Sequence, residues 1–388
     1  MAGIPGIIYP PTVDFNYLVQ RPQQLLKALS QLGVTIYFLN RCAHCQEEAR
    51  GIERYNEHFY LFHQEEPSYP AHIRPVVYYS NPTQVENISS YNPGLRVFDS
   101  LDDTVEGFST WKTYYPRAVA SADLVLAASD KLFSRAREIN PCTVLLPNGC
   151  DYDYFSQAGT GQRARPVDLP DLRAKVIGYI GVVASWCDLE LLDGLAAAFP
   201  DCSLLIIGPL YGVHNIPLRP NLHWLGYKDY DKLIDYAGHF DVGIIPFKTS
   251  VLTEAVNPIK MWEYMALGIP IVTTALPEAG RYGDIVYCSA GRAEFISHTR
   301  QALQETGNRR EQRMALAREN SWMVRAKQML KAIEEKLQAK GIRTRGSLPT
   351  PPAAVAYRCR KYYAPSRVKY PEVKKFKLSL TGGYPCPK

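Results

Sequence analysis

The sequence predicts an α/β fold with two doubly wound, Rossmann-like domains that face each other across a cleft. Short buried runs alternate with amphipathic helical segments in both halves of the chain, a pattern typical of parallel sheets with crossover helices. A polar stretch rich in Gly, Gln and Arg ends near Arg165 and separates the two series. We therefore expect a first domain over residues 1–165, a second over residues 166–340 and a tail over residues 341–388.

Six short apolar runs in the first half have β-strand character. These predicted strands cover residues 6–10, 35–40, 75–80, 96–100, 124–129 and 143–147. Between the first two strands, residues 21–32 place leucines on one face of an amphipathic helix that ends at Gly33. A strand, a helix and a second strand in this order form one crossover unit of a parallel sheet.

The second half repeats this pattern. Its predicted strands cover residues 175–183, 203–208, 222–225, 242–246, 271–274 and 285–288, and residues 292–340 are helical in pattern. Ligands of open α/β sheets bind at the carboxyl ends of the strands, so the cleft between the two halves is the expected site.

The net charge of +6 is unevenly distributed. Residues 341–388 hold eleven Lys and Arg against the single acid Glu372, which leaves 33 Lys and Arg against 37 Asp and Glu in the rest of the chain. The globular body is therefore mildly acidic, and we expect no nucleic-acid partner. The Pro-rich, basic tail is expected to be flexible. Peripheral contact with an anionic membrane is the alternative for this tail.

The nine cysteines are odd in number and scattered, so we expect reduced thiols rather than a disulfide framework. Cys42 and Cys45 flank His44 in a CxxC, but a zinc site needs a second ligand pair and the chain has no second CxxC. We expect no metal and no cofactor. The chain has no run of about 18 apolar residues and its first residues do not resemble a signal peptide, which predicts a cytoplasmic protein.

The segment 257–272, NPIKMWEYMALGIPIV, has the local chemistry of a ligand site. Asn257 is a good N-cap and Pro258 a good first helical residue, so a helix is expected to begin here and to end near Gly268. Lys260 lies in the first turn, where the helix dipole disfavours a cation, and Glu263 follows one turn later. An anion held by the helix N-terminus and Lys260 would account for both residues. The alternative is a simple Lys260–Glu263 pair on a solvated face.

This segment resembles the donor-binding signature of the family 4 (group 1) glycosyltransferases of GT-B fold, in which a Glu-x7-Glu pair precedes a small-residue turn, Gly-x-Pro and a buried strand. Glu263 matches the second Glu, which in that family binds the nucleotide ribose. The first Glu, which contacts the transferred sugar, falls on Ala255, and the neighbouring Glu254 would point elsewhere. The motif NP-x-K-x-x-EY is similar to the form that this signature takes in a subgroup of bacterial cell-surface polysaccharide and teichuronic-acid-type transferases.

The resemblance covers most of residues 1–340 and implies a nucleotide diphosphate sugar bound by the second domain. Lys260 is then the main phosphate counter-charge, because the turn after the strand at 175–183 lacks the cations usual in the family. The implied donor-binding residues are Gly181, Ser185, Trp186, Asp188, Tyr227, Asn257, Pro258, Ile259, Lys260 and Glu263.

Candidate acceptor-side residues follow strands of the first domain. Asp102 and Asp103 stand at a predicted strand end, where a carboxylate could bind or deprotonate an acceptor hydroxyl. The alternative is that one of them caps the next helix. Asp14, in the first strand-to-helix loop, is a second candidate. Arg21 is either an anion ligand in the cleft or a solvated helix residue.

The resemblance implies a retaining, metal-independent glycosyltransferase, with Asp102, Asp103 and Lys260 as the catalytic candidates. Its donor is a nucleotide diphosphate sugar and its acceptor a glycan or a lipid-linked glycan of the cell surface. Two alternatives stay open: a non-catalytic nucleotide-sugar-binding scaffold, for which Ala255 argues, and a nucleotide-sugar 2-epimerase of the same fold.

Overall fold

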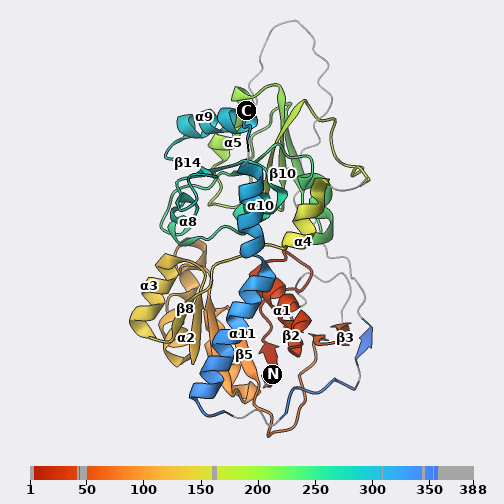
Figure 1. The fold of residues 1–388 in the computed structure, drawn as a ribbon, viewed down its shortest axis with the longest axis vertical. Coiled ribbons are helices and arrows are strands. Elements are labelled where there is room, and N and C mark those ends of the chain that lie inside the picture. The colour runs from red at the N-terminus through yellow and green to blue at the C-terminus, as the bar shows by residue number, and fades with distance from the viewer. Residues whose placement is uncertain are drawn as a thin grey trace, which may run out of the picture.

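The computed structural model describes residues 4–41, 43, 50–159, 164–307, 309–342, 346–352 and 354–356. Two α/β domains lie one above the other in Figure 1, each built on its own sheet, so the predicted fold class is confirmed. The CxxC residues Cys42 and Cys45, with His44, lie outside the described part of the chain. No helix within the described ranges is both long and apolar enough to span a bilayer.

The first sheet has nine strands in the order β15-β3-β4-β2-β1-β5-β6-β7-β8. Every neighbouring pair is parallel except β3 with β4. The strands are β1 (Ile7–Tyr9), β2 (Ile36–Asn40), β3 (Gly51–Asn56), β4 (Phe59–His63), β5 (Val76–Tyr79), β6 (Leu95–Ser100), β7 (Leu124–Ala127), β8 (Thr143–Leu145) and β15 (Val355–Ala356). The β3–β4 hairpin and β15 were not predicted from the sequence.

Four α-helices accompany this sheet: α1 (Arg21–Gln31), α2 (Tyr115–Ser121), α3 (Asp130–Ile139) and α11 (Trp322–Ala339). The predicted helix over residues 21–32 is α1, and Gly33 follows it with a φ of +85°, which glycine adopts at little cost.

The second sheet is entirely parallel, in the order β11-β10-β9-β12-β13-β14. Its strands are β9 (Lys175–Ile180), β10 (Cys202–Ile207), β11 (Leu222–Gly226), β12 (Val242–Ile245), β13 (Ile271–Thr274) and β14 (Tyr287–Ser289). Its helices are α4 (Tyr152–Phe155), α5 (Leu189–Ala198), α6 (Leu233–Ala237), α7 (Ile259–Leu267), α8 (Pro277–Gly280), α9 (Arg292–Leu303) and α10 (Arg309–Glu319). The order of the strands reverses between β9 and β12, which is where such sheets bind ligands.

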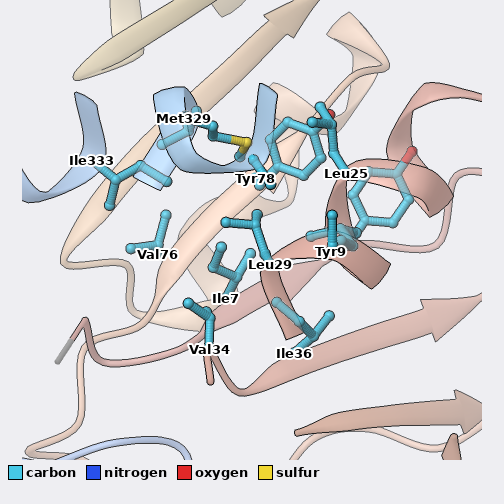
Figure 2. Close-up of a cluster of buried hydrophobic side chains, with 14 of the residues drawn as sticks. Ile7, Tyr9, Leu25, Leu29, Val34, Ile36, Val76, Tyr78, Met329 and Ile333 are labelled. Carbon is cyan, nitrogen blue, oxygen red and sulfur yellow. The ribbon is translucent and has the colours of Figure 1, made fainter. Parts of the chain in front are cut away.

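The last long helix, α11, returns to the first domain (Figure 1). It packs against α1, and its buried side chains Met329 and Ile333 belong to the core that also contains Ile7 and Leu29 (Figure 2). The sequence division assigned residues 322–340 to the second domain. Their packing places them with the first, because the apolar face of α11 covers the sheet there.

The described part of the tail also lies on the first domain. The Leu348 side chain is buried, its N–H donates to the Pro5 carbonyl at 3.0 Å, and the Tyr37 hydroxyl donates to the Pro349 carbonyl. Residues 355 and 356 then extend the sheet as β15 beside β3. Residues 346–352 and 354–356 are therefore docked rather than flexible. The basic residues from position 357 onward lie outside the described residues.

We predict that Ile333→Ala lowers the free energy of unfolding by about 2–5 kcal/mol, because it leaves a cavity between α11 and the first sheet. Lys331→Ala, on the exposed face of the same helix at 77% side-chain exposure, should change it by less than about 0.5 kcal/mol. Urea unfolding of both variants measures the difference. Equal midpoints for the two variants would show that α11 does not contribute to this core.

Candidate functional site

A cleft of about 1030 Å³, including its opening to solvent, lies between the two domains. This volume accommodates a ligand of nucleotide-sugar size. The first domain contributes the loop after β1 and the end of β6, and the second contributes the turns after β9 and β12 and the start of α7. The lining residues are Leu18, Val19, Gln20, Arg21, Leu101, Asp102, Asn148, Tyr179, Gly181, Val182, Trp186, Phe247, Val256, Asn257, Pro258, Ile259 and Lys260.

The N-terminus of α7 opens into this cleft. Pro258 is its N-cap and supplies no side-chain hydrogen bond. The N–H of Met261 donates to the Pro258 carbonyl at 3.1 Å, whereas the N–H groups of Ile259 and Lys260 have no acceptor among the described residues. Free amides at the positive end of a helix dipole are the groups that bind anions at helix N-termini in proteins generally.

The helix α7 is held against the second sheet by its buried face. The N–H of Ile180, the last residue of β9, donates to the Tyr264 hydroxyl at 2.9 Å. Met261, Trp262 and Met265 are fully buried in the same core. The start of α7 is therefore fixed beside the carboxyl end of β9.

Lys260 and Glu263 form an ion pair with 2.8 Å between Nζ and Oε2. The sequence analysis gave this ion pair as an alternative, but on a solvated helix face. The pair is instead largely buried, because the side chain of Glu263 is 2% exposed and that of Lys260 is 20% exposed. Burial raises the pKa of Glu263, and the Lys260 charge opposes this rise. A buried carboxylate with one ionic partner retains acceptor capacity for hydroxyl groups of a ligand.

Asn257 has a different role from the predicted one. Its side chain does not cap α7, because Pro258 holds the N-cap position. Instead its Oδ1 accepts from Trp262 Nε1 at 3.0 Å and from the N–H of Asn148 at 3.2 Å, and its Nδ2 donates to Glu278 at 2.9 Å. The side-chain Nδ2 of Asn148 also donates to the backbone carbonyl of Asn257 at 2.6 Å.

Arg21 is neither a solvated residue nor a free anion ligand. It is 2% exposed, and its guanidinium donates to both Asp99 oxygens at 2.8 and 2.9 Å. It also donates to the Leu146 carbonyl at 2.8 Å and to the Asn148 side chain at 3.2 Å. Arg21 therefore continues the network of Asn257 and Asn148 into the first domain.

Asp102 and Asp103 separate into two roles. Asp102 lines the cleft, and burial, with a smaller contribution from the Asp99 charge, raises its pKa to about 6. Asp103 is buried, accepts from the N–H of Thr104 at 2.7 Å and pairs with Arg135. Neither caps the next helix, a 3-10 turn over Glu106–Trp111 that is preceded by Val105. Asp103 is thus committed within the first domain, whereas Asp102 is available to a ligand.

Asp14 is also committed within the first domain. It is 4% exposed, its Oδ1 accepts from the N–H of Ala43 at 2.9 Å, and it is not one of the cleft-lining residues. The Asp14 carboxylate therefore fixes the backbone at Ala43, shortly after β2.

The backbones that follow β9 and β10 pack tightly against each other at Gly181 and Gly208. A Cβ on Gly208 would lie 1.8 Å from the Gly181 carbonyl oxygen, so only glycine fits there. Trp186 lines the cleft, whereas Ser185 is exposed and is not among the residues that line either cavity. Asp188 instead caps α5 by accepting from the N–H of Leu191 at 2.9 Å, and it pairs with Arg292 at 3.0 Å. Asp188 is therefore structural.

A second, smaller cavity joins this turn and is lined by Gly181, Tyr227, Lys228, Tyr230 and Lys260. The Tyr227 ring packs on Tyr17 of the first domain with 4.9 Å between centroids. The Tyr230 hydroxyl is buried and has no hydrogen-bond partner among the described residues. An aromatic cavity with an unused hydroxyl suits a planar base and its ribose.

Position 255 explains the departure from the Glu-x7-Glu pattern. Ala255 is 1% exposed and packs against Ala127, Ala128 and Leu132 of the first domain. A glutamate there would be buried among apolar side chains. Glu254 pairs with Lys131 at 3.0 Å on the surface.

Leu18, Val19, Asn148 and Phe247 are among the cleft residues that sequence reasoning missed. Each follows a strand or stands in the interdomain linker. The rule that ligands lie at the carboxyl ends of strands was a usable signal for Leu18, Val19 and Phe247.

We predict that Asn257→Ala lowers the free energy of unfolding by at least about 2 kcal/mol, because it leaves the Trp262 indole N–H, the Asn148 N–H and the Glu278 carboxylate without their buried partner. Asn215→Ala, at an exposed position, is the matched control and should change stability by less than about 0.5 kcal/mol. Chemical denaturation compares the two. An Asn257→Ala protein as stable as the control would contradict a structural role for this network.

Comparison with curated proteins finds a relative in Bacillus subtilis strain 168, the putative teichuronic acid biosynthesis glycosyltransferase TuaH. The two sequences are 28% identical over 222 residues, 54% of this chain and 55% of that protein. The match thus spans about half the length of the curated relative. No family model matches the sequence.

Solved structures of the same fold cover most of the chain. Sucrose-phosphate synthase from Thermosynechococcus elongatus aligns with a TM-score of 0.64 at 16% identity, over 86% of this chain and 100% of that one. The α,α-trehalose 6-phosphate synthase of Burkholderia multivorans aligns at 0.63 and 11% identity, over 88% and 100%. HepE of Anabaena, in complex with UDP and glucose, aligns at 0.59 and 14%, over 85% and 99%. The chain therefore has the GT-B fold, and its curated relative and structural neighbours include glycosyltransferases, which confirms the resemblance identified in the sequence.

Proposed function

We propose that this chain is a glycosyltransferase that moves a sugar from a nucleotide diphosphate sugar to a glycan or lipid-linked acceptor. The observation that carries the proposal is the start of α7, where two unpaired backbone N–H groups and Lys260 meet at the cleft. Backbone amides at a helix N-terminus and a lysine ammonium together bind phosphate oxygens. The curated relative and the neighbour that holds UDP and glucose support the donor class.

The donor has a natural orientation in this site. We place its diphosphate at Ile259 and Lys260 and its base and ribose in the cavity of Tyr227 and Tyr230. Glu263 is buried behind Lys260 and lines neither cavity, so the proposed ribose contact requires the Lys260 side chain to move toward the diphosphate. The sugar then extends from Lys260 toward Trp186 and Phe247 in the larger part of the cleft.

Asp102 is the proposed acceptor-side group. Its carboxylate lines the same cleft from the first domain, and it makes no hydrogen bond or ion pair with another described residue. It would accept the hydrogen of an acceptor hydroxyl as the sugar is transferred. Lys260 and the α7 amides would stabilise the charge on the leaving diphosphate without a metal ion.

The stereochemistry and biological role are inferred from the sequence resemblance and the relative. We infer retention at the anomeric carbon and a role in cell-surface polysaccharide synthesis at the inner face of the membrane. Product anomers identified by NMR test the first, and an inverted product would refute it.

A non-catalytic nucleotide-sugar-binding protein is the second candidate. The buried Ala255 favours it, because no carboxylate from that position reaches the sugar. Incubation with nucleotide sugars separates the two candidates: donor hydrolysis or transfer supports the enzyme, and tight binding without turnover supports the scaffold.

We predict that Lys260→Met weakens binding of the matching nucleoside diphosphate about 10- to 100-fold, the loss of one charge-assisted contact of about 1.5–3 kcal/mol. Calorimetric titration with UDP, GDP, ADP and dTDP identifies the base and measures the loss. Lys232→Met is the matched control, because Lys232 is 61% exposed and lies outside both cavities. Unchanged affinity in Lys260→Met would exclude the proposed diphosphate site.

We predict that the rate of donor hydrolysis or transfer falls as the pH drops through about 6. Burial raises the pKa of Asp102 to about 6, so protonation removes the hydrogen-bond-accepting carboxylate below that pH. Asp102→Asn should lower the rate by about 10²–10⁴-fold and abolish this pH dependence, with nucleotide affinity unchanged. A variant that keeps the wild-type pH profile would assign the titration to another group.

A further inference from the structure

Cys142 and Lys336 form a close nucleophile pair outside the cleft. The Lys336 Nζ donates a hydrogen bond to the Cys142 Sγ, with 2.8 Å between the two atoms. Cys142 stands immediately before β8 in the first domain, and Lys336 lies in the last turn of α11. Both side chains are half-buried, so small solutes reach them from solvent.

Cys142 differs from the other described thiols in its contact with a lysine. Cys150, Cys187 and Cys202 are buried, and burial raises the pKa of each of them and of the half-buried Cys288. A raised pKa lowers the thiolate fraction that reacts with oxidants. Among the five described cysteines, Cys142 is the one with a lysine ammonium in contact with its sulfur.

The short contact spans two different parts of the fold. Nitrogen and sulfur joined through one shared oxygen lie closer together than the same atoms in van der Waals contact, and 2.8 Å approaches that spacing. We propose that Cys142 and Lys336 are the site of an oxidative cross-link in which one oxygen atom bridges Sγ and Nζ.

The chemistry requires hydrogen peroxide as the oxidant. The Lys336 ammonium loses a proton to solvent, and the amine, the Cys142 thiol and two molecules of peroxide then give the N–O–S bridge and three molecules of water. The S–H bond, one N–H bond and both peroxide O–O bonds break. One S–O and one N–O bond form. Sulfur and nitrogen each lose two electrons, and the two peroxides accept all four.

The cross-link would close a long loop of chain. Residues 142 and 336 are 194 positions apart, and the segment between them contains the whole second sheet. Closing such a loop restricts the unfolded chain, which stabilises the folded state. It would lock α11 onto the first domain, beside the Lys340–Asp123 ion pair at 2.5 Å.

Mass spectrometry of the full-length protein tests the proposal. After treatment with hydrogen peroxide, we expect a mass about 14 Da above that of the reduced protein, returned to the original value by dithiothreitol. Peptide mapping should join the Cys142 and Lys336 peptides, and the cross-linked protein should unfold a few degrees higher than the reduced protein.

Matched variants make the assignment specific. The increase of about 14 Da should be lost in Cys142→Ser and in Lys336→Met, which keeps the aliphatic packing, and should persist in Lys340→Met and Cys288→Ser. Circular dichroism under reducing conditions checks that each variant is folded. No joined peptide in the wild type would overturn the proposal. So would oxidation of Cys142 that adds about 16 or 32 Da equally in the wild type and Lys336→Met, or a bridge with a loss of about 2 Da, the mark of a direct S–N bond.

Discussion

The hydrogen bonds of Asn257 with Asn148, and of Asn148 with Arg21, join the two domains at the point where α7 begins. Asn257 is buried, receives the Trp262 indole N–H, and donates to Glu278, whose other oxygen accepts from the N–H of Asp130 in the first domain at 2.9 Å. Buried polar groups carry a large penalty when they lose a partner. These hydrogen bonds therefore hold the linker, α7 and the first domain in place. Moving any one of the three would leave buried polar groups of the others without partners.

The proposed donor site depends on this network. With its side chain occupied in the network, Asn257 leaves the first amides of α7 uncapped, so Ile259 and Lys260 present unpaired N–H groups to the cleft. The ion pair with Glu263 positions the Lys260 side chain near the start of α7. The hydrogen bond from the Ile180 N–H to the Tyr264 hydroxyl fixes the helix to the end of β9. A helix N-terminus that lacks its own cap but is rigidly anchored is pre-organised for an anion, because the ligand then does not need to order it.

Local sequence patterns predicted the features that depend on residues close together in the chain, namely strands and helix starts. Alternation of apolar runs and helical faces identified the strands from β1 to β14 except the β3–β4 hairpin, and the start of α7 was placed within one or two residues. Roles that depend on distant partners were not predictable. Asn257 was predicted to cap α7, because nothing local shows its partner Asn148, which is 109 positions away. For Arg21 the sequence left a cleft anion ligand and a solvated helix residue open, because its partner Asp99 is 78 positions away. Asp188 caps a helix and pairs with Arg292, and α11 packs on the first domain, for the same reason. Glu263 and Lys260 were identified because both lie on one short helix.

The central claim is that the first amides of α7 bind the diphosphate of a nucleotide. Backbone amide NMR of labelled protein titrated with a nucleoside diphosphate, and separately with the matching nucleoside, tests it most directly. The account predicts that the Ile259 and Lys260 amide resonances shift with the diphosphate and stay in place with the nucleoside, which lacks the phosphates. Equal shifts with both ligands, or a diphosphate that binds without moving these two resonances, would contradict it.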